Sequence, residues 1–214
     1  MQFLTIAAVF AATVSALPTL VQRQEEYTSL NYSQLAVLHH NIHRANHSAP
    51  NVTWDDDLAA TAKKIADTCN FEHQMDFDGG NYGQNLAAGV KGENISSVIT
   101  DLWYNGEEPL YPAYGREPTD SEMTNTFHSW GHFTQVVWKN TSIIGCATTH
   151  CSGGVANTGS NVLPYLTVCN YKTPGNYGDQ YAEQVGGPLG NETIGWDYGR
   201  NLTTADLLSV VDLE

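Results

Sequence analysis

Two histidines, His73 and His132, are the side chains of this sequence best suited to chemistry. Two imidazoles that meet acidic residues in a cleft can bind a divalent cation or carry a proton between groups. The sequence does not show that the two side chains converge, and a single histidine more often has a hydrogen-bonded structural role. A metal or proton-transfer site is therefore one of two interpretations of these histidines.

Two other reactive patterns each lack an essential part. His39 and His43 lie one helical turn apart, as in a zinc-dependent protease, but His40 stands where that motif requires glutamate. We therefore expect a histidine cluster on a helix surface. Ser129 lies near His132, yet the sequence has no Gly-x-Ser-x-Gly motif, which argues against a serine nucleophile.

Hydrophobic periodicity predicts three helices in the first half of the chain. Ser33 can cap the first helix, and the acidic residues 55–57 suit the N-terminus of the second. The apolar stripe of the second helix ends at Cys69, and the third spans about residues 96–104 before Gly106. The first helix has apolar residues at Leu35, Leu38, Ile42 and Ala45, and another face with His40, Arg44 and His47.

Strand-forming residues dominate the second half of the chain. β-branched and aromatic runs predict strands at 143–147 and 162–171, whereas the run at 136–138 fits a strand or a helical turn. Glycines predict a loop over 79–92, and prolines predict a long surface loop over 109–130. Helices followed by strands indicate an α+β domain in which helices cover an antiparallel sheet.

The charge of the chain limits its partners. With 23 acidic and 9 basic residues, the formal net charge is -14. Such a surface repels nucleic-acid phosphates and anionic lipids, so we expect no nucleic-acid partner. Solubility is the simpler explanation of the charge, and attraction of a cationic partner is the alternative.

The two ends of the chain differ from its middle. Residues 1–16 join an apolar run to small residues and read as a signal peptide that is cleaved after Ala16. A membrane anchor is the alternative, although a spanning helix needs about 20 apolar residues. We expect a flexible leader at 17–32, one domain at 33–188 and a C-terminal extension of unassigned role at 189–214. No later segment is apolar enough to span a membrane.

The cysteines and the glycosylation motifs indicate secretion. An even number of cysteines in an exported chain predicts two disulfides, with three possible pairings, and the absence of a CxxC motif argues against a zinc-thiolate site. Several Asn-x-Ser/Thr motifs predict a glycosylated, extracellular protein. The cysteines are Cys69, Cys146, Cys151 and Cys169. The motifs begin at Asn31, Asn46, Asn51, Asn94, Asn140, Asn191 and Asn201.

Ordered sequence blocks between about residues 34 and 188 connect these features. The two most specific are Gly131-His132-Phe133-Thr134-Gln135-Val136-Val137-Trp138 and Cys169-Asn170-Tyr171-x-x-Pro174-Gly175-Asn176. The others are His40-Asn41-x-x-Arg44, Trp54-Asp55, Cys69-x-Phe71-x-His73, Gly83-Gln84-Asn85-Leu86-Ala87 and Trp103-Tyr104. The chain thereby resembles the CAP superfamily (cysteine-rich secretory, antigen-five and pathogenesis-related class-one proteins, SCP domain), and in particular its secreted fungal members.

This resemblance implies a three-layer α-β-α sandwich with a central antiparallel sheet and a large cleft. It places His73, Gln84, Glu107 and His132 together in that cleft, with Gln84 where the family has glutamate. Because an amide is a weaker ligand for hard cations, we expect at most weak binding of zinc or magnesium at His73 and His132, and no required cofactor. The resemblance also implies disulfides between Cys69 and Cys146 and between Cys151 and Cys169.

Fungal relatives in the family are associated with sterols and other small lipids. The resemblance therefore favours a non-enzymatic lipid-binding function, either in the cleft or through the loop from Tyr111 to Phe127. Tyr111, Tyr114 and Phe127 are the loop aromatics that would cover a sterol. One alternative is an extracellular effector that binds a protein or wall partner. A less favoured alternative is a metal- or histidine-dependent hydrolase that uses His132 with Glu107 or Ser129.

Overall fold

A computed structural model describes residues 30–191 and 193–199 of the chain. At its centre is a four-stranded sheet with the strand order β1-β3-β4-β2. β3 pairs antiparallel with β4, and β4 with β2, whereas the short β1 pairs in parallel with β3. The sheet is thus antiparallel at its centre and mixed at one edge. The strands are β1 (Thr53–Trp54), β2 (Gly83–Ala88), β3 (Ile143–His150) and β4 (Tyr165–Lys172).

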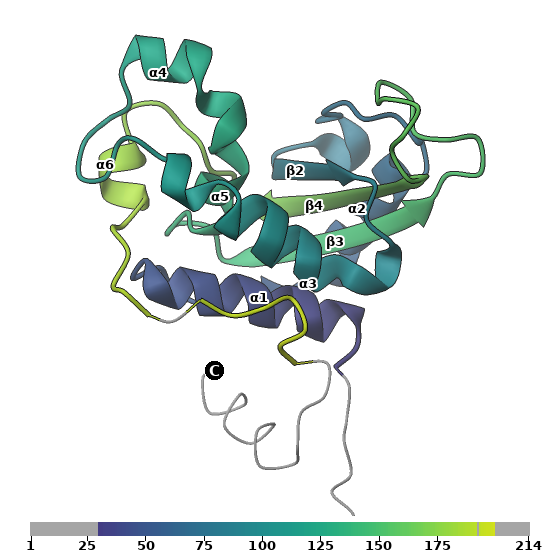
Figure 1. Ribbon diagram of the computed structural model, residues 1–214, viewed down its shortest axis with the longest axis horizontal. Helices are drawn as coiled ribbons and strands as arrows, with labels where there is room; N and C mark the ends of the chain where they lie inside the picture. Colours follow the sequence, from purple (N-terminus) through teal and green to yellow (C-terminus); the bar gives the residue numbers. More distant parts are fainter. Residues whose placement is uncertain (1–29, 192, 200–214) are drawn as a thin grey trace, which may run out of the picture.

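Helices cover both faces of the sheet and form the expected three-layer α-β-α sandwich (Figure 1). Alternate strand residues point to opposite faces. Cys146 and Cys169 pack into the core shared with the first and third helices, whereas Ala147 and Val168 pack into the core beneath the second. The principal helices are α1 (Tyr32–Asn46), α2 (Asp56–Ala66), and α3 (Ile95–Ser97) with its π-helical continuation η3 (Val98–Asn105).

α1 begins two residues earlier than expected, because Asn31 caps it in place of Ser33. The Asn31 carboxamide oxygen accepts a hydrogen bond from the Gln34 backbone N–H at 2.9 Å, and the Gln34 side chain accepts one from the Asn31 N–H at 3.0 Å. This reciprocal pair is a capping box, which satisfies two backbone donors at the helix start. The helix therefore includes Tyr32, which was expected to belong to the leader. The expected signal peptide, at 1–16, lies outside the described residues.

The histidine cluster of α1 is buried, so the expectation of a surface cluster was wrong. His39, His40 and His43 have at most 2% of their surface exposed. The Thr100 hydroxyl on η3 lies 2.7 Å from a ring nitrogen of His39 and of His43. The other ring nitrogen of His39 lies 2.9 Å from the carbonyl oxygen of Tyr198. The helix is covered on several sides, so its polar residues face protein groups.

Arg44 joins α1 to the chain segments around it. Its fully buried guanidinium donates five hydrogen bonds, all to backbone carbonyls, with lengths of 2.7 to 3.4 Å. Burial lowers the pKa of this guanidinium to about 10, so it stays charged at neutral pH. The carbonyls belong to Pro50, Val136, Trp138, Lys139 and Thr141.

The disulfides join Cys69 to Cys151 and Cys146 to Cys169, so the implied pairing was wrong. Strand register explains the second bond, because Cys146 and Cys169 are direct partners on β3 and β4 with Cα atoms 4.1 Å apart. Cys151 follows the end of β3, where Cys69, just beyond α2, lies opposite it. All four cysteines are bonded, which confirms the expectation of two disulfides.

Two segments expected as loops have regular structure. Within the glycine-rich stretch 79–92, residues 83–88 form β2, which is buried along most of its length. The segment 109–130 contains α4 (Asp120–Asn125) and a short 3-10 helix, η5 (Phe127–Ser129). The ambiguous run at 136–138 begins with the last residue of α5 (Gly131–Val136), so it is helical at its start. No helix within the described ranges is long and apolar enough to span a membrane.

The C-terminal extension packs against α1 as far as it is described (Figure 1). Asn46 binds its first part, because the carboxamide oxygen accepts hydrogen bonds from the backbone N–H groups of Leu189 and Asn191 at 3.1 and 3.0 Å. Gly199 has a φ of 82°, which strains any residue with a side chain, and a Cβ atom there would also lie 2.8 Å from the Leu38 side chain, so the position favours glycine.

Candidate functional site

His132 and Glu107 form one side of the candidate site. α5 carries His132, and Glu107 follows η3 by two residues. The Glu107 Oε1 atom lies 2.6 Å from His132 Nδ1, while Oε2 accepts hydrogen bonds from the backbone N–H groups of His132 and Phe133, both at 3.0 Å. Trp103 stacks on the imidazole with ring centroids 5.9 Å apart. The carboxylate thereby fixes the position and the orientation of His132.

His73 and Gln84 form the other side. Gln84 is buried on β2, and its Oε1 atom lies 3.0 Å from Nδ1 of the exposed His73. The same oxygen accepts a hydrogen bond from the Gln74 backbone N–H at 3.2 Å, and Gln84 Nε2 donates to Asn170 Oδ1 at 3.1 Å. The Asn170 Nδ2 atom is buried and has no hydrogen-bond partner within the described ranges. The four residues that the family resemblance places in one cleft thus form two hydrogen-bonded pairs, His73 with Gln84 and His132 with Glu107.

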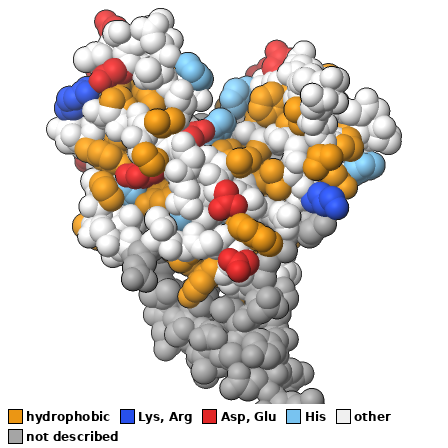
Figure 2. Space-filling view, in the orientation of Figure 1, with side chains coloured by type: hydrophobic (Ala, Val, Ile, Leu, Met, Phe, Trp, Pro, Cys, Tyr) orange, Lys and Arg blue, Asp and Glu red, His pale blue; other side chains and the backbone are white. Residues whose placement is uncertain are grey.

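A cavity of about 430 Å³ lies between the two pairs. In the space-filling view the molecule is notched between the part that carries α4 and the part that carries β2, and histidine side chains lie in the notch (Figure 2). The lining includes apolar side chains as well as the two histidines, so it suits a ligand with both apolar and polar parts. The apolar lining residues are Phe71, Leu86 and Phe127.

His128, another lining residue, was not found by the sequence analysis. It is exposed and precedes the Gly131-His132 block by only three residues. The spacing to His132 is one helical turn, but His128 and His132 lie in different helices, because η5 ends at Ser129 and α5 begins at Gly131, with Trp130 between them. A search of the 109–130 segment for histidines next to aromatic residues would have found it.

The residues present do not fit a divalent metal ion. A zinc site needs three or four ligands, and the described residues contain no group of three or more histidine, cysteine or acidic side chains that could hold a metal. Both oxygens of Glu107 accept hydrogen bonds from the protein, and Gln84 is uncharged. The two histidines alone make an incomplete ligand set.

Among the described residues, neither Ser129 nor a cysteine is paired with His132 as a nucleophile would be. Ser129 lies in η5, and no hydrogen bond joins it to His132 among the described residues. His132 Nδ1 is instead directed at Glu107. With every cysteine in a disulfide, the described residues contain no activated serine or thiol beside His132.

Two of the three aromatics expected to contact a lipid, Tyr111 and Tyr114, do not line the cavity. Tyr111 is 5% exposed and belongs to the core. The partly buried Tyr114 donates a hydrogen bond to Glu108 at 2.6 Å, and its ring lies 4.9 Å from that of Tyr111. Phe127 alone among them lines the cavity.

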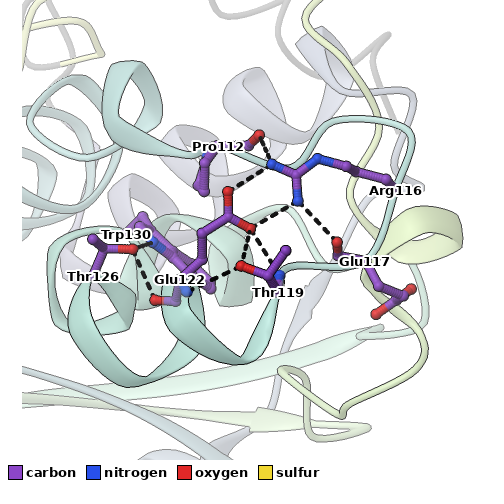
Figure 3. Close-up of polar contacts among 7 residues, drawn as sticks. All are labelled: Pro112, Arg116, Glu117, Thr119, Glu122, Thr126 and Trp130. Carbon is purple, nitrogen blue, oxygen red and sulfur yellow. Dashed lines mark hydrogen bonds and ion pairs between the residues drawn. The ribbon is translucent and has the colours of Figure 1, made fainter.

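Arg116 braces the segment that carries Phe127 (Figure 3). Its guanidinium donates to both carboxylate oxygens of Glu122, at 2.7 and 2.6 Å, and to the carbonyls of Pro112 and Glu117. Glu122 also completes the capping box of α4 with Thr119. Hydrogen bonds from Arg116 and Thr119 lower the pKa of Glu122 to about 2. The expected surface loop is thus held in one arrangement by its own polar residues.

The glycosylation motifs differ in their exposure. Asn31, Asn51, Asn140 and Asn191 are exposed, and Asn94 is partly buried. Asn46 is buried, and its Nδ2 atom, where a glycan would attach, donates a hydrogen bond to the Tyr104 hydroxyl at 2.8 Å. A glycan at Asn46 would displace this hydrogen bond, so from the structure we expect that motif to stay unmodified. Asn201 lies outside the described residues.

Comparison with known proteins agrees with this architecture. The chain is 44% identical over 165 residues to a probable pathogenesis-related protein of Arthroderma benhamiae, covering 77% of this chain and 52% of that protein. It is 34% identical over 158 residues to Protein PRY2 of Saccharomyces cerevisiae, covering 72% of this chain and 41% of that one. The chain thus spans about half the length of these relatives or less.

A solved structure supports the fold in the same way. The crystal structure of NaASP2 with Zn²⁺ aligns with a TM-score of 0.54 at 19% identity, covering 75% of this chain and 88% of that chain. The model of the CAP family, described as the cysteine-rich secretory protein family, matches residues 37–171. This range contains both histidine pairs of the cavity and both disulfides. The chain belongs to the CAP family and is related to the fungal pathogenesis-related and PRY proteins.

Proposed function

We propose that this chain is a secreted, non-enzymatic protein that binds a sterol or another small lipid in the cavity between His73 and His132. The size and the lining of the cavity are the main support for this proposal. Its volume of about 430 Å³ lies in the range of small-molecule sites, and Phe71, Leu86 and Phe127 give it apolar surface. Each 100 Å² of lipid surface that is buried there contributes about 2.5 kcal/mol before the cost of association.

The cavity is a better candidate than the loop aromatics alone. Tyr111 would have to leave the core before it could contact a lipid, and Tyr114 would have to break its hydrogen bond to Glu108. Phe127 contributes to the cavity in its present position, where its ring packs at 5.0 Å from that of Trp130. The loop therefore takes part in binding through Phe127.

Three observations support secretion. The family is described as secretory, the described domain contains two disulfides, and exposed glycosylation motifs occur on it. Disulfides persist in oxidising compartments, and glycosylation marks the secretory pathway. We infer that the protein acts outside the cell.

Equilibrium binding of a radiolabelled sterol to the secreted protein tests the proposal, with Phe127→Ala as the variant. Loss of one buried aromatic side chain removes about 2 kcal/mol, so affinity should fall roughly thirtyfold. Tyr165→Ala is the matched control, because Tyr165 is also a partly buried aromatic residue but packs against His150 and does not line the cavity. Its affinity should equal that of the wild type.

Two outcomes would contradict the proposal. If the wild type showed no saturable binding of a sterol or a fatty acid, a protein or wall partner would replace the lipid as the favoured ligand. If Phe127→Ala and Tyr165→Ala bound the sterol as tightly as the wild type, the lipid would lie outside this cavity.

A further inference from the structure

The orientation of the Gln84 amide is fixed by backbone groups of known polarity. The Gln74 N–H can only donate, and the Gln84 atom that lies 3.2 Å from it is Oε1. The Gln74 carbonyl can only accept, and the Gln84 atom that lies 3.4 Å from it is Nε2. The atom 3.0 Å from His73 Nδ1 is therefore an oxygen, which accepts a hydrogen bond.

His73 and His132 consequently hold their protons on the same ring nitrogen. Gln84 Oε1 and Glu107 Oε1 are both acceptors, so each neutral imidazole carries its proton on Nδ1. The lone pair of each ring is then on Nε2. Within the described part of the chain, neither Nε2 atom has a hydrogen bond to the protein, and both side chains line the cavity.

We propose that the cavity recognises the head group of its ligand as a hydrogen-bond donor, namely an uncharged hydroxyl that donates to Nε2 of His73 or His132. This inference rests on the proposed function and names the ligand class. Gln84 and Glu107 are positioning residues, because they act on the ligand only through the histidine proton. A lipid alcohol such as a free sterol has the required donor, whereas an ester or ether of the same lipid does not.

The charges around the cavity disfavour an anionic head group. No lysine or arginine lines the cavity, and Glu72 does, so a carboxylate or sulfate head group would meet repulsion. Among the lining residues, Glu72 is the carboxylate that a cationic head group would meet, and its Oε2 atom already accepts a hydrogen bond from Asn70 Nδ2 at 3.0 Å. Both Glu107 oxygens likewise accept protein hydrogen bonds, and Gln84 has no charge. His128, which also lines the cavity, is the remaining titratable side chain there.

Binding of a head-group series to the full secreted protein tests this inference. The probes are one sterol with a free hydroxyl, its methyl ether and its sulfate ester. The loss of one hydrogen bond of about 1.4 kcal/mol corresponds to tenfold weaker binding, so the methyl ether and the sulfate should bind about tenfold more weakly than the alcohol, or worse. Equal or tighter binding of the ether or the sulfate overturns this inference and leaves the proposed function intact. No binding of any probe overturns both.

Histidine variants test whether His73 and His132 cause the preference for the alcohol over its ether. In His73→Phe or in His132→Phe, the preference for the alcohol over its ether should fall at least threefold, and the affinity for the ether should stay near the wild-type value. His150→Phe is the matched control, since His150 is exposed and packs near Tyr165 outside the cavity. An unchanged preference in both cavity variants, with thermal unfolding confirming that each is folded, overturns the inference.

A spectroscopic measurement tests the positioning role of Gln84 without any ligand. In long-range ¹H–¹⁵N spectra of the full histidine-labelled protein, His73 and His132 should both appear as the tautomer protonated on Nδ1 at a pH where they are neutral. Gln84→Met should change the tautomer of His73 and leave that of His132 unchanged. A wild-type His73 or His132 protonated on Nε2, or a His73 unaffected by Gln84→Met, overturns the inference.

Discussion

Gln84 Oε1 lies 3.0 Å from His73 Nδ1, so one side of the cavity consists of an uncharged amide–imidazole pair. The other side pairs a histidine with a carboxylate at 2.6 Å. The two sides therefore have similar hydrogen-bond geometry and different charge. This asymmetry weakens the site for cations and leaves it suited to a neutral ligand.

The first prediction concerns metal binding. Gln84→Glu supplies the carboxylate that the cavity lacks, so its affinity for Zn²⁺ should rise roughly tenfold or more over the wild type. Isothermal titration calorimetry measures this change. Gln180→Glu is the control, because it adds the same charge at the exposed start of α6 (Tyr181–Gln184). Tight Zn²⁺ binding by the wild type, or no gain in Gln84→Glu, would contradict this view of the site.

The second prediction concerns the disulfides. Cys69–Cys151 spans 82 residues and Cys146–Cys169 spans 23, so the first should restrict the unfolded chain more. Removal of both cysteines of a bond should lower the free energy of unfolding by about 4 kcal/mol for the longer loop and about 3 kcal/mol for the shorter. Denaturant unfolding of the paired Cys→Ser variants measures both values. Cleavage of the unreduced protein between residues 147 and 150 separates Cys146 from Cys151, so mass spectrometry of the peptides identifies the partner of Cys69. A peptide in which Cys69 is linked to Cys146 would refute the pairing.

The third prediction concerns glycosylation. Glycopeptide mapping of the secreted protein should find Asn46 unmodified, because its side chain binds Tyr104 and the backbone of the C-terminal extension. The exposed Asn51, only five residues later, is the internal comparison. A glycan on Asn46 in the folded protein would show that the extension does not pack on α1 as described.

The fourth prediction concerns acid stability. Burial lowers the pKa of His40 to about 3 and also lowers the pKa of His43 and His47. The unfolded chain binds protons near the ordinary histidine pKa of about 6.5, whereas the folded chain does not, so stability is present above that pH and is lost as the pH falls toward 3. The urea midpoint should therefore decrease between about pH 6.5 and pH 5, where carboxylates of ordinary pKa stay ionised. The measurement is made at high salt, which screens the net charge of the chain. A urea midpoint that stays constant or rises as the pH falls from 6.5 to 5 would be inconsistent with neutral buried histidines.

Much of the architecture could be predicted from local patterns. The acidic start of α2 identified its N-terminus, and Asp55 does cap it by accepting a hydrogen bond from the Leu58 N–H at 2.6 Å. Strands β3 and β4 and the π-helical third helix were all located approximately. The helix start and the strands depend on residues close in sequence, and for that reason local patterns reveal them. The convergence of His73 and His132 in one cavity was expected from the family resemblance of the ordered blocks and from no local pattern.

The errors arose where distant contacts decide the outcome. Periodicity placed the α1 histidines on a surface, but η3 and the C-terminal extension cover them. β2 is buried along nearly all of its length, so it lacks the alternation that marks a half-exposed strand. The disulfide pairing depends on the register of β3 against β4, which a one-residue shift would change.

Photoaffinity mapping tests the central claim most directly. The secreted protein would be equilibrated with a photoactivatable sterol, irradiated, and digested for mass spectrometry. A lipid in the cavity predicts crosslinks in the lining segments 71–73, 84–86 and 127–132, and their loss when unlabelled sterol competes. Crosslinks confined to other segments, such as residues 189–199 of the extension, would contradict the assignment of the cavity as the lipid site.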